Sequence, residues 1–250
     1  DHESSDWLFY WFMNKSASLI SINTFFLIVE FGYIGCTLWA CKRLMRNNVW
    51  VALLMNLATF SYYSYGINGI RSGLACSIML VAFSYILGSK SDKVKAAILC
   101  FCAYNIHHSM ALPILMMAVS AFILPRFKDN LRLTVAFWVL SIFLSLTVGD
   151  WLETFFAGLG FDDRLNSYIT SDEYDEQFSS TGFRWDFLLY SVMPIVLGWY
   201  VVIKKHISNK TYLMLLNTYI LCNSFWVMLI RASFSNRFAY LSWFIYPILL

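Results

Sequence analysis

The sequence predicts an all-α, polytopic helical membrane protein, and three observations support this. Hydrophobic residues make up 59% of the 250 positions, whereas charged residues make up only 13%. Several apolar segments contain about 17 or more residues, which is long enough for a helix to cross a bilayer. The alternating ten-residue segments that are typical of a membrane β-barrel are not seen in the sequence. Because backbone groups in lipid must be paired within their own segment, the apolar segments are expected to be helices.

The first expected helices are 17–40, 49–65 and 72–87. The first contains one charged residue, Glu30, and the other two lie in a stretch whose only formal charge is Arg71. The motif GINGIRS around this arginine predicts an outer turn between the second and third helices. Its glycines would let the backbone approach a ligand closely, and the positive end of the next helix would point toward the same ligand.

The next apolar segment, 96–124, is 29 residues long and is interrupted by NIHHSMALP. As a single helix it would be about 43 Å long, which is long for one membrane span and short for two. The basic connections on either side, GSKSDKVK and PRFKDNLR, are both predicted to be cytoplasmic. The segment is therefore expected to cross outward and return, bending near residues 107–113, as two half-length helices or two thinly embedded spans. One steeply tilted helix is the alternative.

Four short connections set the predicted orientation, because basic loops stay in the cytoplasm. They hold twelve of the 18 Lys and Arg residues and only two acids, Asp92 and Asp129. The twelve are Lys42, Arg43, Arg46, Lys90, Lys93, Lys95, Arg126, Lys128, Arg132, Lys204, Lys205 and Lys210. Because each span moves the chain to the opposite side of the membrane, the same orientation puts a second group of residues on the outer side. They are Asp1, Glu3, Asp6, Arg71, His107, His108, Arg184, Arg231 and Arg237.

The remaining expected helices are 133–149, 187–203, 211–230 and 238 onward. In total, about eight to nine transmembrane or half-length helices are expected, in a single integral membrane domain over 1–250 that is cut at both ends. The segment 150–183 is expected to be a large acidic periplasmic loop. Its aromatic residues could stack on sugar rings or lie at the membrane interface.

The outer arginines are candidates for binding an anion. Embedding a cation at mid-bilayer costs about 2.5 to 3.5 kcal/mol, and less near the interface, so such a residue normally has a partner or a task. Only two acids outside the loops, Glu30 and Asp186, are available to neutralise Arg71, Arg184, Arg231 and Arg237. Guanidinium groups match phosphate oxygens, which favours a lipid-linked pyrophosphate as the ligand.

Each arginine also has a simpler interpretation. Arg71 or Arg231 could extend to the outer headgroups. Arg184 could cap a helix start beside Asp186. Arg231 and Arg237 would lie about 120° apart on an unbroken helix, so they share a pocket only if SFSNR bends the chain.

Several other chemistries have little support in the sequence. The adjacent residues His107 and His108 cannot both face one pocket on a regular helix, and a lone histidine on an apolar face is commonly structural. No HExxH, GxSxG or P-loop motif is present, and the six cysteines fall in or beside apolar segments without a CxxC pair. No metal, cofactor or nucleic-acid partner is expected.

Two segments resemble a known family. FSYYSYGINGIRSGLACSIMLVAFSYI, a basic turn, and then CFCAYNIHHSMALPILM resemble the EpsG/Wzy family of bacterial exopolysaccharide and O-antigen polymerases. That family shows an N-G-I-R-Q-x-L-A type motif, a helix pair with an H-x-S-x-L type motif, and later an Arg followed by an aromatic-rich span. The resemblance is good over about residues 7–125 and weaker beyond, through FSNRFAYLSWF.

The resemblance places the family arginine on Arg71, the histidine on His107, and the late arginine on Arg237, with Ser109 two residues after the histidine. Two departures from the family pattern are Ser72 in place of the usual Gln and the doubled histidine.

What the resemblance implies is a GT-C-like glycosyltransferase with many spans in the bacterial inner (cytoplasmic) membrane. It would polymerise O-antigen, and hence lipopolysaccharide, or exopolysaccharide at the periplasmic face. A growing glycan would move from undecaprenyl pyrophosphate onto a lipid-linked repeat unit. The implied partners are the lipid-linked oligosaccharide, membrane lipid and a chain-length regulator.

The expected mechanism assigns catalysis to Arg71, Arg237 and His107. The arginines would stabilise negative charge as the pyrophosphate leaves, and His107, or an outer acid such as Asp1 or Glu3, would take the proton of the attacking hydroxyl. The expected substrate-binding residues are Arg71, Arg231, Arg237, Arg184, His108 and Ser109.

Three other functions are open at this point. A flippase or transporter of lipid-linked oligosaccharide would also use intramembrane arginines. A membrane O-acyltransferase could use an intramembrane histidine with a nearby serine. A structural subunit would tolerate loss of the outer arginines.

Overall fold

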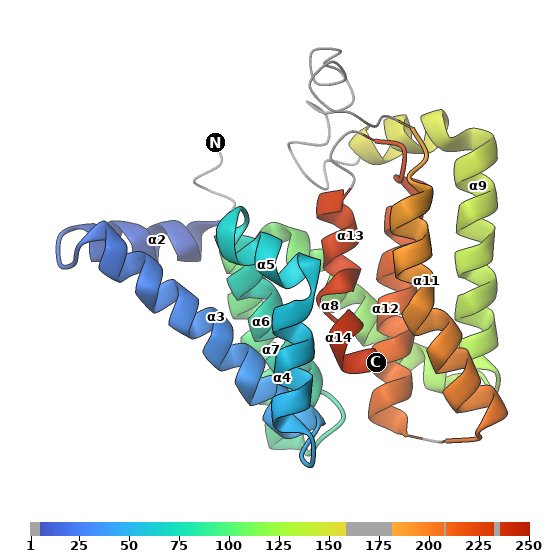
Figure 1. Cartoon of the computed structure of the whole chain (residues 1–250), viewed down its shortest axis with the longest axis horizontal. Helices are drawn as coiled ribbons and strands as arrows, with labels where there is room; N and C mark the ends of the chain where they lie inside the picture. The colour runs from blue at the N-terminus through green and yellow to red at the C-terminus, as the bar shows by residue number, and fades with distance from the viewer. Residues whose placement is uncertain (1–5, 159–181, 208, 233–235) are drawn as a thin grey trace. The chain divides into compact units, whose positions relative to one another are not determined.

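The computed structural model describes residues 6–158, 182–207, 209–232 and 236–250, and all regular secondary structure within them is helical (Figure 1). Within these described ranges, four segments are long and apolar enough to cross a membrane: Ile22–Leu44, His108–Arg126, Asn130–Gly149 and Trp185–Lys204. The protein is therefore an all-α, polytopic membrane protein, as predicted. Its chain forms two compact units, Asp1–Met117 and Ala118–Leu250.

The first unit contains helices α2 to α8. In chain order these are α2 (Trp7–Ala17), α3 (Ile22–Leu44), α4 (Val49–Ala58), α5 (Phe60–Ile67), α6 (Ile70–Tyr85), α7 (Lys90–Ile106), the 3₁₀ turn η1 (His108–Met110) and α8 (Ala111–Ala118). The expected helix 49–65 is two helices, because Thr59 between them has an extended backbone with ψ 140°.

Helix α6 is the centre of this unit and packs against α3 and α7. Small residues allow the close approach that holds membrane helices together. Gly32 of α3 lies against Leu74, and a Cβ at Gly73 would stand 3.4 Å from the ring of Tyr33. Ala75 is fully buried in the same helix.

The 96–124 segment bends where the sequence predicts. Helix α7 begins with a capping box of Ser89 and Asp92 and ends at Ile106. His107 then has an extended backbone, with φ −153° and ψ 114°, before the chain turns into η1 and α8. The segment is therefore not one continuous helix.

The second unit surrounds α12. Its elements are the π-helical turn η2 (Val119–Ile123), the 3₁₀ turn η3 (Leu124–Arg126), α9 (Asn130–Gly158), α11 (Trp185–Trp199), the π-helical turn η5 (Tyr200–Lys204), α12 (Lys210–Met228), α13 (Asn236–Trp243) and α14 (Tyr246–Leu249). Nearly every residue of α12 from Met214 onward is buried.

Buried polar side chains connect α12 to its neighbours. Asn223 accepts a hydrogen bond from Trp138 Nε1 of α9 at 2.8 Å and donates one to Ser242 Oγ of α13 at 3.0 Å. The Tyr219 hydroxyl donates to the Ser191 carbonyl of α11 at 2.8 Å. Hydrogen bonds of this kind stabilise helix association where no hydrophobic driving force acts between helices.

The acidic loop expected at 150–183 falls largely outside the described residues. Helix α9 has a kink at Val148 and continues to Gly158, so its final turns extend into that segment. Residues 159–181 are not described, and the role expected for the loop stays a prediction.

Candidate functional site

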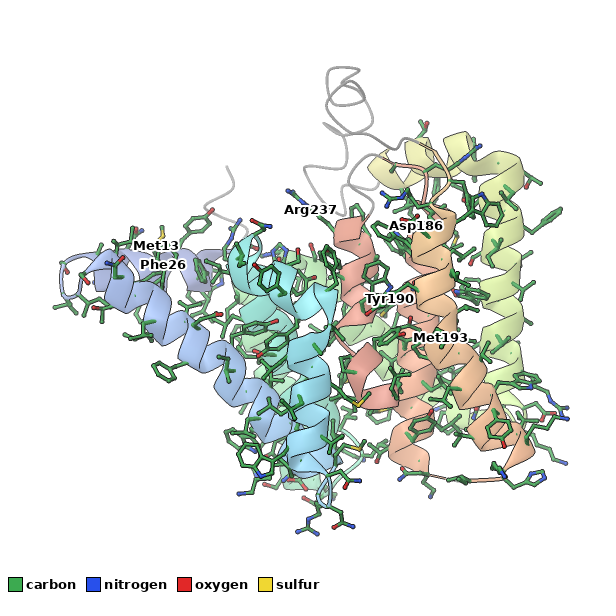
Figure 2. The ribbon with its side chains drawn as sticks, viewed as in Figure 1. Met13, Phe26, Asp186, Tyr190, Met193 and Arg237 are labelled. Atoms are coloured by element: carbon green, nitrogen blue, oxygen red, sulfur yellow. The ribbon has the colours of Figure 1, made fainter. Side chains whose placement is uncertain are left out.

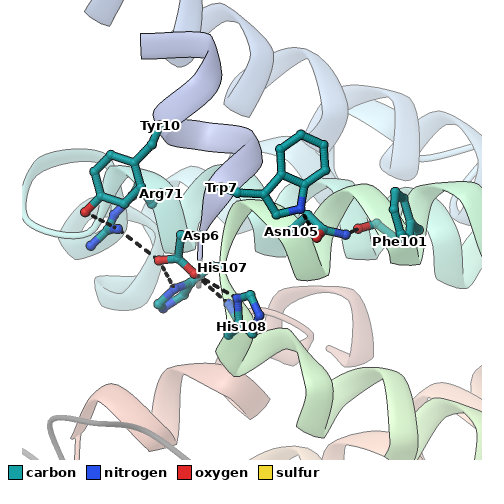
Figure 3. A network of polar contacts seen from close by, with 8 residues as sticks. All are labelled: Asp6, Trp7, Tyr10, Arg71, Phe101, Asn105, His107 and His108. Carbon is teal, nitrogen blue, oxygen red and sulfur yellow. Dashed lines mark hydrogen bonds and ion pairs between the residues drawn. The ribbon is translucent and has the colours of Figure 1, made fainter. Parts of the chain in front are cut away.

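A carboxylate in the first unit, that of Asp6, brings together three of the residues that the sequence singled out (Figure 3). Asp6 Oδ2 lies 2.9 Å from Arg71 Nη1 and 3.3 Å from His107 Nδ1. Asp6 Oδ1 accepts a hydrogen bond from the His108 backbone N–H at 3.0 Å and lies 3.2 Å from His108 Nδ1. The carboxylate therefore has four polar partners, and these fill about all of its acceptor positions when both imidazoles donate from Nδ1.

Local structure explains why Asp6 is available for these partners. It occupies the N-cap position of α2, yet its side chain makes no capping hydrogen bond to its own helix. The indole of Trp7, the next residue, donates to the side chain of Asn105 on α7. This second contact holds the start of α2 against the end of α7, beside His107 and His108.

Arg71 lies in the first turn of α6, after a turn that needs a glycine. A Cβ at Gly69 would stand 2.9 Å from Cδ1 of Tyr65, closer than real Cβ atoms approach a neighbour. Arg71 Nη1 donates both to Asp6 and to the Tyr10 hydroxyl, the latter at 3.0 Å. The Arg71 side chain keeps 23% of its surface exposed.

This pairing corrects one sequence-based expectation. Only Glu30 and Asp186 were expected to be able to neutralise the outer arginines, but Asp6 forms an ion pair with Arg71. Asp6 was recognised only as an outer-side residue, because it precedes the first apolar run and no motif connects it to Arg71.

Both histidines reach the same carboxylate, which was not expected for adjacent residues on a regular helix. The extended backbone of His107 is the reason, because the helical rotation of about 100° per residue does not apply there. Because α7 ends before His108, the backbone N–H of His108 is available to donate a hydrogen bond to Asp6. The His108 ring lies 4.2 Å from that of Tyr104. Ser109 follows in η1 and is partly buried.

The electrostatics of the cluster favour an ionised Asp6. Burial alone would raise the pKa of this carboxyl, but the hydrogen bond and charge of His107, the His108 N–H and the charge of Arg71 together lower it to about 2. A carboxylate with such a low pKa is a poor proton acceptor. It is well suited to orienting a histidine, because an imidazole whose Nδ1–H donates to it has Nε2 free to accept a proton.

Three further candidates, Arg184, Arg231 and Arg237, lie in the second unit. Arg184 forms a two-pronged ion pair with Asp186, from Nε to Oδ1 at 3.0 Å and from Nη2 to Oδ2 at 2.6 Å. Its guanidinium also lies 3.8 Å from the ring centre of Phe187. Arg184 is thus neutralised by one of the acids that the sequence indicated.

Arg231 and Arg237 belong to different elements. Arg231 follows the end of α12 and lies against Gly149, where a Cβ would stand 3.0 Å from its Cδ. Arg237 is exposed in the first turn of α13 (Figure 2). Helix α12 therefore ends before SFSNR, as a shared pocket would require, but the roles of both arginines stay predictions.

The described residues contain no group of three or more His, Cys, Asp or Glu side chains arranged to hold a metal ion. The chemistry that the cluster itself offers is a histidine held by a carboxylate next to a partly exposed guanidinium. Such a pairing suits removal of a proton beside an anion.

Comparison with known proteins agrees with the resemblance found in the sequence. No curated protein and no solved structure matches the chain significantly. A family model does match, over residues 2–250, and it describes the EpsG family. Because the match covers almost the whole chain, this protein is a member of the EpsG family.

Proposed function

We propose that this protein is a polysaccharide polymerase that transfers a growing glycan from undecaprenyl pyrophosphate onto a lipid-linked repeat unit at the periplasmic face of the inner membrane. Membership of the EpsG family supports a polysaccharide-polymerase-like role in general. The observation that carries the more specific proposal is the cluster of Asp6, Arg71, His107 and His108.

In the proposed reaction, His107 is the general base. Its Nδ1 faces Asp6, so Nε2 takes the proton from the hydroxyl of the attacking sugar. The hydroxyl oxygen then forms a bond to the anomeric carbon of the growing glycan, while the bond from that carbon to the pyrophosphate oxygen breaks. Asp6 stays ionised and stabilises the protonated imidazole. Asp1 and Glu3, the alternative bases, lie outside the described residues.

Arg71 is the proposed anion contact. Asp6 and Tyr10 both bond its Nη1, which leaves the remaining guanidinium donors for phosphate oxygens. The leaving pyrophosphate keeps the electron pair of the broken bond, and a positioned guanidinium stabilises that charge. Because the ion pair with Asp6 is formed already, Arg71 would meet the substrate in a fixed orientation.

The test is the glycan ladder from a strain that lacks the gene and carries full-length protein or a variant at matched membrane level. We expect Arg71→Ala and His107→Gln each to reduce the ladder to a single repeat unit. Arg132→Ala is the control, because it removes an arginine whose side chain is 58% exposed and whose partner lies three residues away on the same surface. A normal ladder from both site variants would overturn the proposal.

The same strains separate the other functions. Loss of the ladder with repeat units collecting on the inner leaflet would indicate a flippase. A ladder of normal length that lacks acyl groups would indicate an O-acyltransferase. A ladder that needs the protein but tolerates both site variants would indicate a structural subunit.

A further inference from the structure

A second charged feature of the first unit lies at the opposite end of α6 from Arg71. It is a groove of about 570 Å³ that is lined by Trp39, Lys42, Arg43 and Arg46. Arg43 contacts Ser84 and Tyr85 in the last turn of α6, whereas Arg71 is in the first turn. About 20 Å of helix separates these two ends, so the groove is distinct from the Asp6 cluster.

The lining of the groove carries three cations and no acid. Lys42 and Arg46 are exposed and have no carboxylate partner in the described parts of the chain. Arg43 is fixed in place, because its Nε donates to Ser84 Oγ at 3.0 Å and its guanidinium lies 3.7 Å from the ring centre of Tyr85. A rigid guanidinium next to two unpaired cations is an arrangement that suits an anion.

The position of the groove along α3 indicates the source of that anion. Helix α3 is long and apolar enough to span a membrane, and Lys42 and Arg43 are in its last turn. These cations are therefore expected at the membrane surface, at the level of the lipid phosphates. Trp39, one helical turn earlier, is 54% exposed, as an indole at the boundary between headgroups and acyl chains would be.

Favourable interaction with the helix dipole does not account for the whole feature. Cations in the last turn stabilise the negative end of a helix, which would explain Lys42 and Arg43. Arg46 lies beyond the C-cap residue Met45, and the exposed indole of Trp39 has no role in that effect.

We propose that this groove binds the headgroup of an anionic phospholipid, with its phosphodiester between Arg43, Lys42 and Arg46 and its acyl chain beside Trp39. A free phosphate ester would satisfy the cations but would gain nothing from the indole. The lipid is also present at high local concentration at this depth, which favours it as the occupant.

The experiment measures lipid retained by full-length protein in detergent by native mass spectrometry, during titration with phosphatidylglycerol or phosphatidylcholine. We expect the protein to prefer phosphatidylglycerol and the double variant Lys42→Gln, Arg46→Gln to weaken its binding about 25- to 30-fold, or about fivefold for each cation removed near the surface. Arg43 is left unchanged because its contacts with α6 are structural.

The matched control is Lys90→Gln with Lys93→Gln, which removes the same charge from the first turn of α7 outside the groove. An equal loss of binding in this control would show that general surface charge attracts the lipid, and would overturn the proposal. Displacement of the lipid by glycerol phosphate at equal concentration would also overturn the proposal, because it would identify a free phosphate ester as the ligand. The melting temperature without added lipid checks that both double variants are folded.

Discussion

Asp6 and Arg71 are 65 residues apart in the sequence, and their side chains form an ion pair of 2.9 Å that is mostly removed from solvent. This pair connects the first residue before α2 to the first turn of α6. It also holds the guanidinium beside the two histidines that share the same carboxylate. The position of a short N-terminal helix and the geometry of the candidate site therefore depend on one acidic side chain.

Removal of that carboxylate should destabilise the protein. The Arg71 side chain is only 23% exposed, and in Asp6→Asn it has no charged partner. We expect the free energy of unfolding to fall by about 1 to 3 kcal/mol. Thermal unfolding in detergent measures the change. Asp186→Asn is the control, because the Asp186 side chain is 59% exposed, against 9% for Asp6, and its ion pair with Arg184 should therefore contribute less. A double-mutant cycle with Arg71→Gln should show that the two effects are not additive.

Acidification should remove the same stabilisation in a defined range of pH. The pKa of Asp6 is about 2 in the folded protein and 3.8 for an ordinary Asp. The contribution of Asp6 to the free energy of unfolding is about 2 kcal/mol. It is present above about pH 4 and is lost as the pH falls toward 2. Melting temperatures from pH 6 to pH 3 should fall more steeply for the natural protein than for Asp6→Asn. Parallel curves would contradict the role of this carboxylate.

A lysine should not replace Arg71. A single ammonium group cannot keep the fixed contacts with Asp6 and Tyr10 and also present a planar set of donors to a phosphate. We expect Arg71→Lys to lower polymer synthesis at least about tenfold, at unchanged protein level. Tyr10→Phe removes one partner of the guanidinium and should have a smaller effect. Full synthesis by Arg71→Lys would exclude the proposed phosphate contact.

The two histidines should differ in their contribution to the reaction. His107→Gln removes the proposed base and should reduce polymer synthesis by about 10²- to 10⁴-fold. His108→Gln should be milder, because the His108 backbone N–H still bonds Asp6 in that variant. The measurement is the rate of glycan elongation in membranes. The reverse order of effects would assign the base to His108.

Gly149 offers a test of Arg231 that leaves the arginine in the sequence. A side chain at Gly149 would meet Arg231 Cδ at 3.0 Å and Nη1 at 3.3 Å. We expect Gly149→Val to displace the guanidinium and to lower polymer synthesis as much as Arg231→Ala does. If both variants make a normal ladder, the predicted contact of Arg231 with substrate is wrong.

Hydropathy and the distribution of basic residues were sufficient to predict the helical membrane class and the bend in the 96–124 segment. They also singled out Arg71, His107 and His108, because a charge or an imidazole in an apolar segment is conspicuous. The contribution of Asp6 could not be predicted in this way. It depends on contacts between residues that are 65 and 101 positions apart in the sequence, and neither periodicity nor a local motif indicates such contacts.

Two local features also escaped prediction. The break at Thr59 and the extended backbone of His107 each depend on one residue leaving the helical region of φ and ψ. Apolar composition does not specify single torsion angles. The arrangement of both histidines around one carboxylate follows from the second of these features.

The sequence distance within the Asp6 cluster has a consequence for biosynthesis. The ribosome makes Asp6 first, Arg71 65 residues later and His107 another 36 residues after that, since the full separation is 101. At about 5 to 20 residues per second, the carboxylate is without its histidines for about 5 to 20 s. Only when α7 has emerged from the ribosome can the start of α2 dock against it. A nascent chain stalled before that point should leave α2 open to protease, and one stalled well beyond it should protect α2.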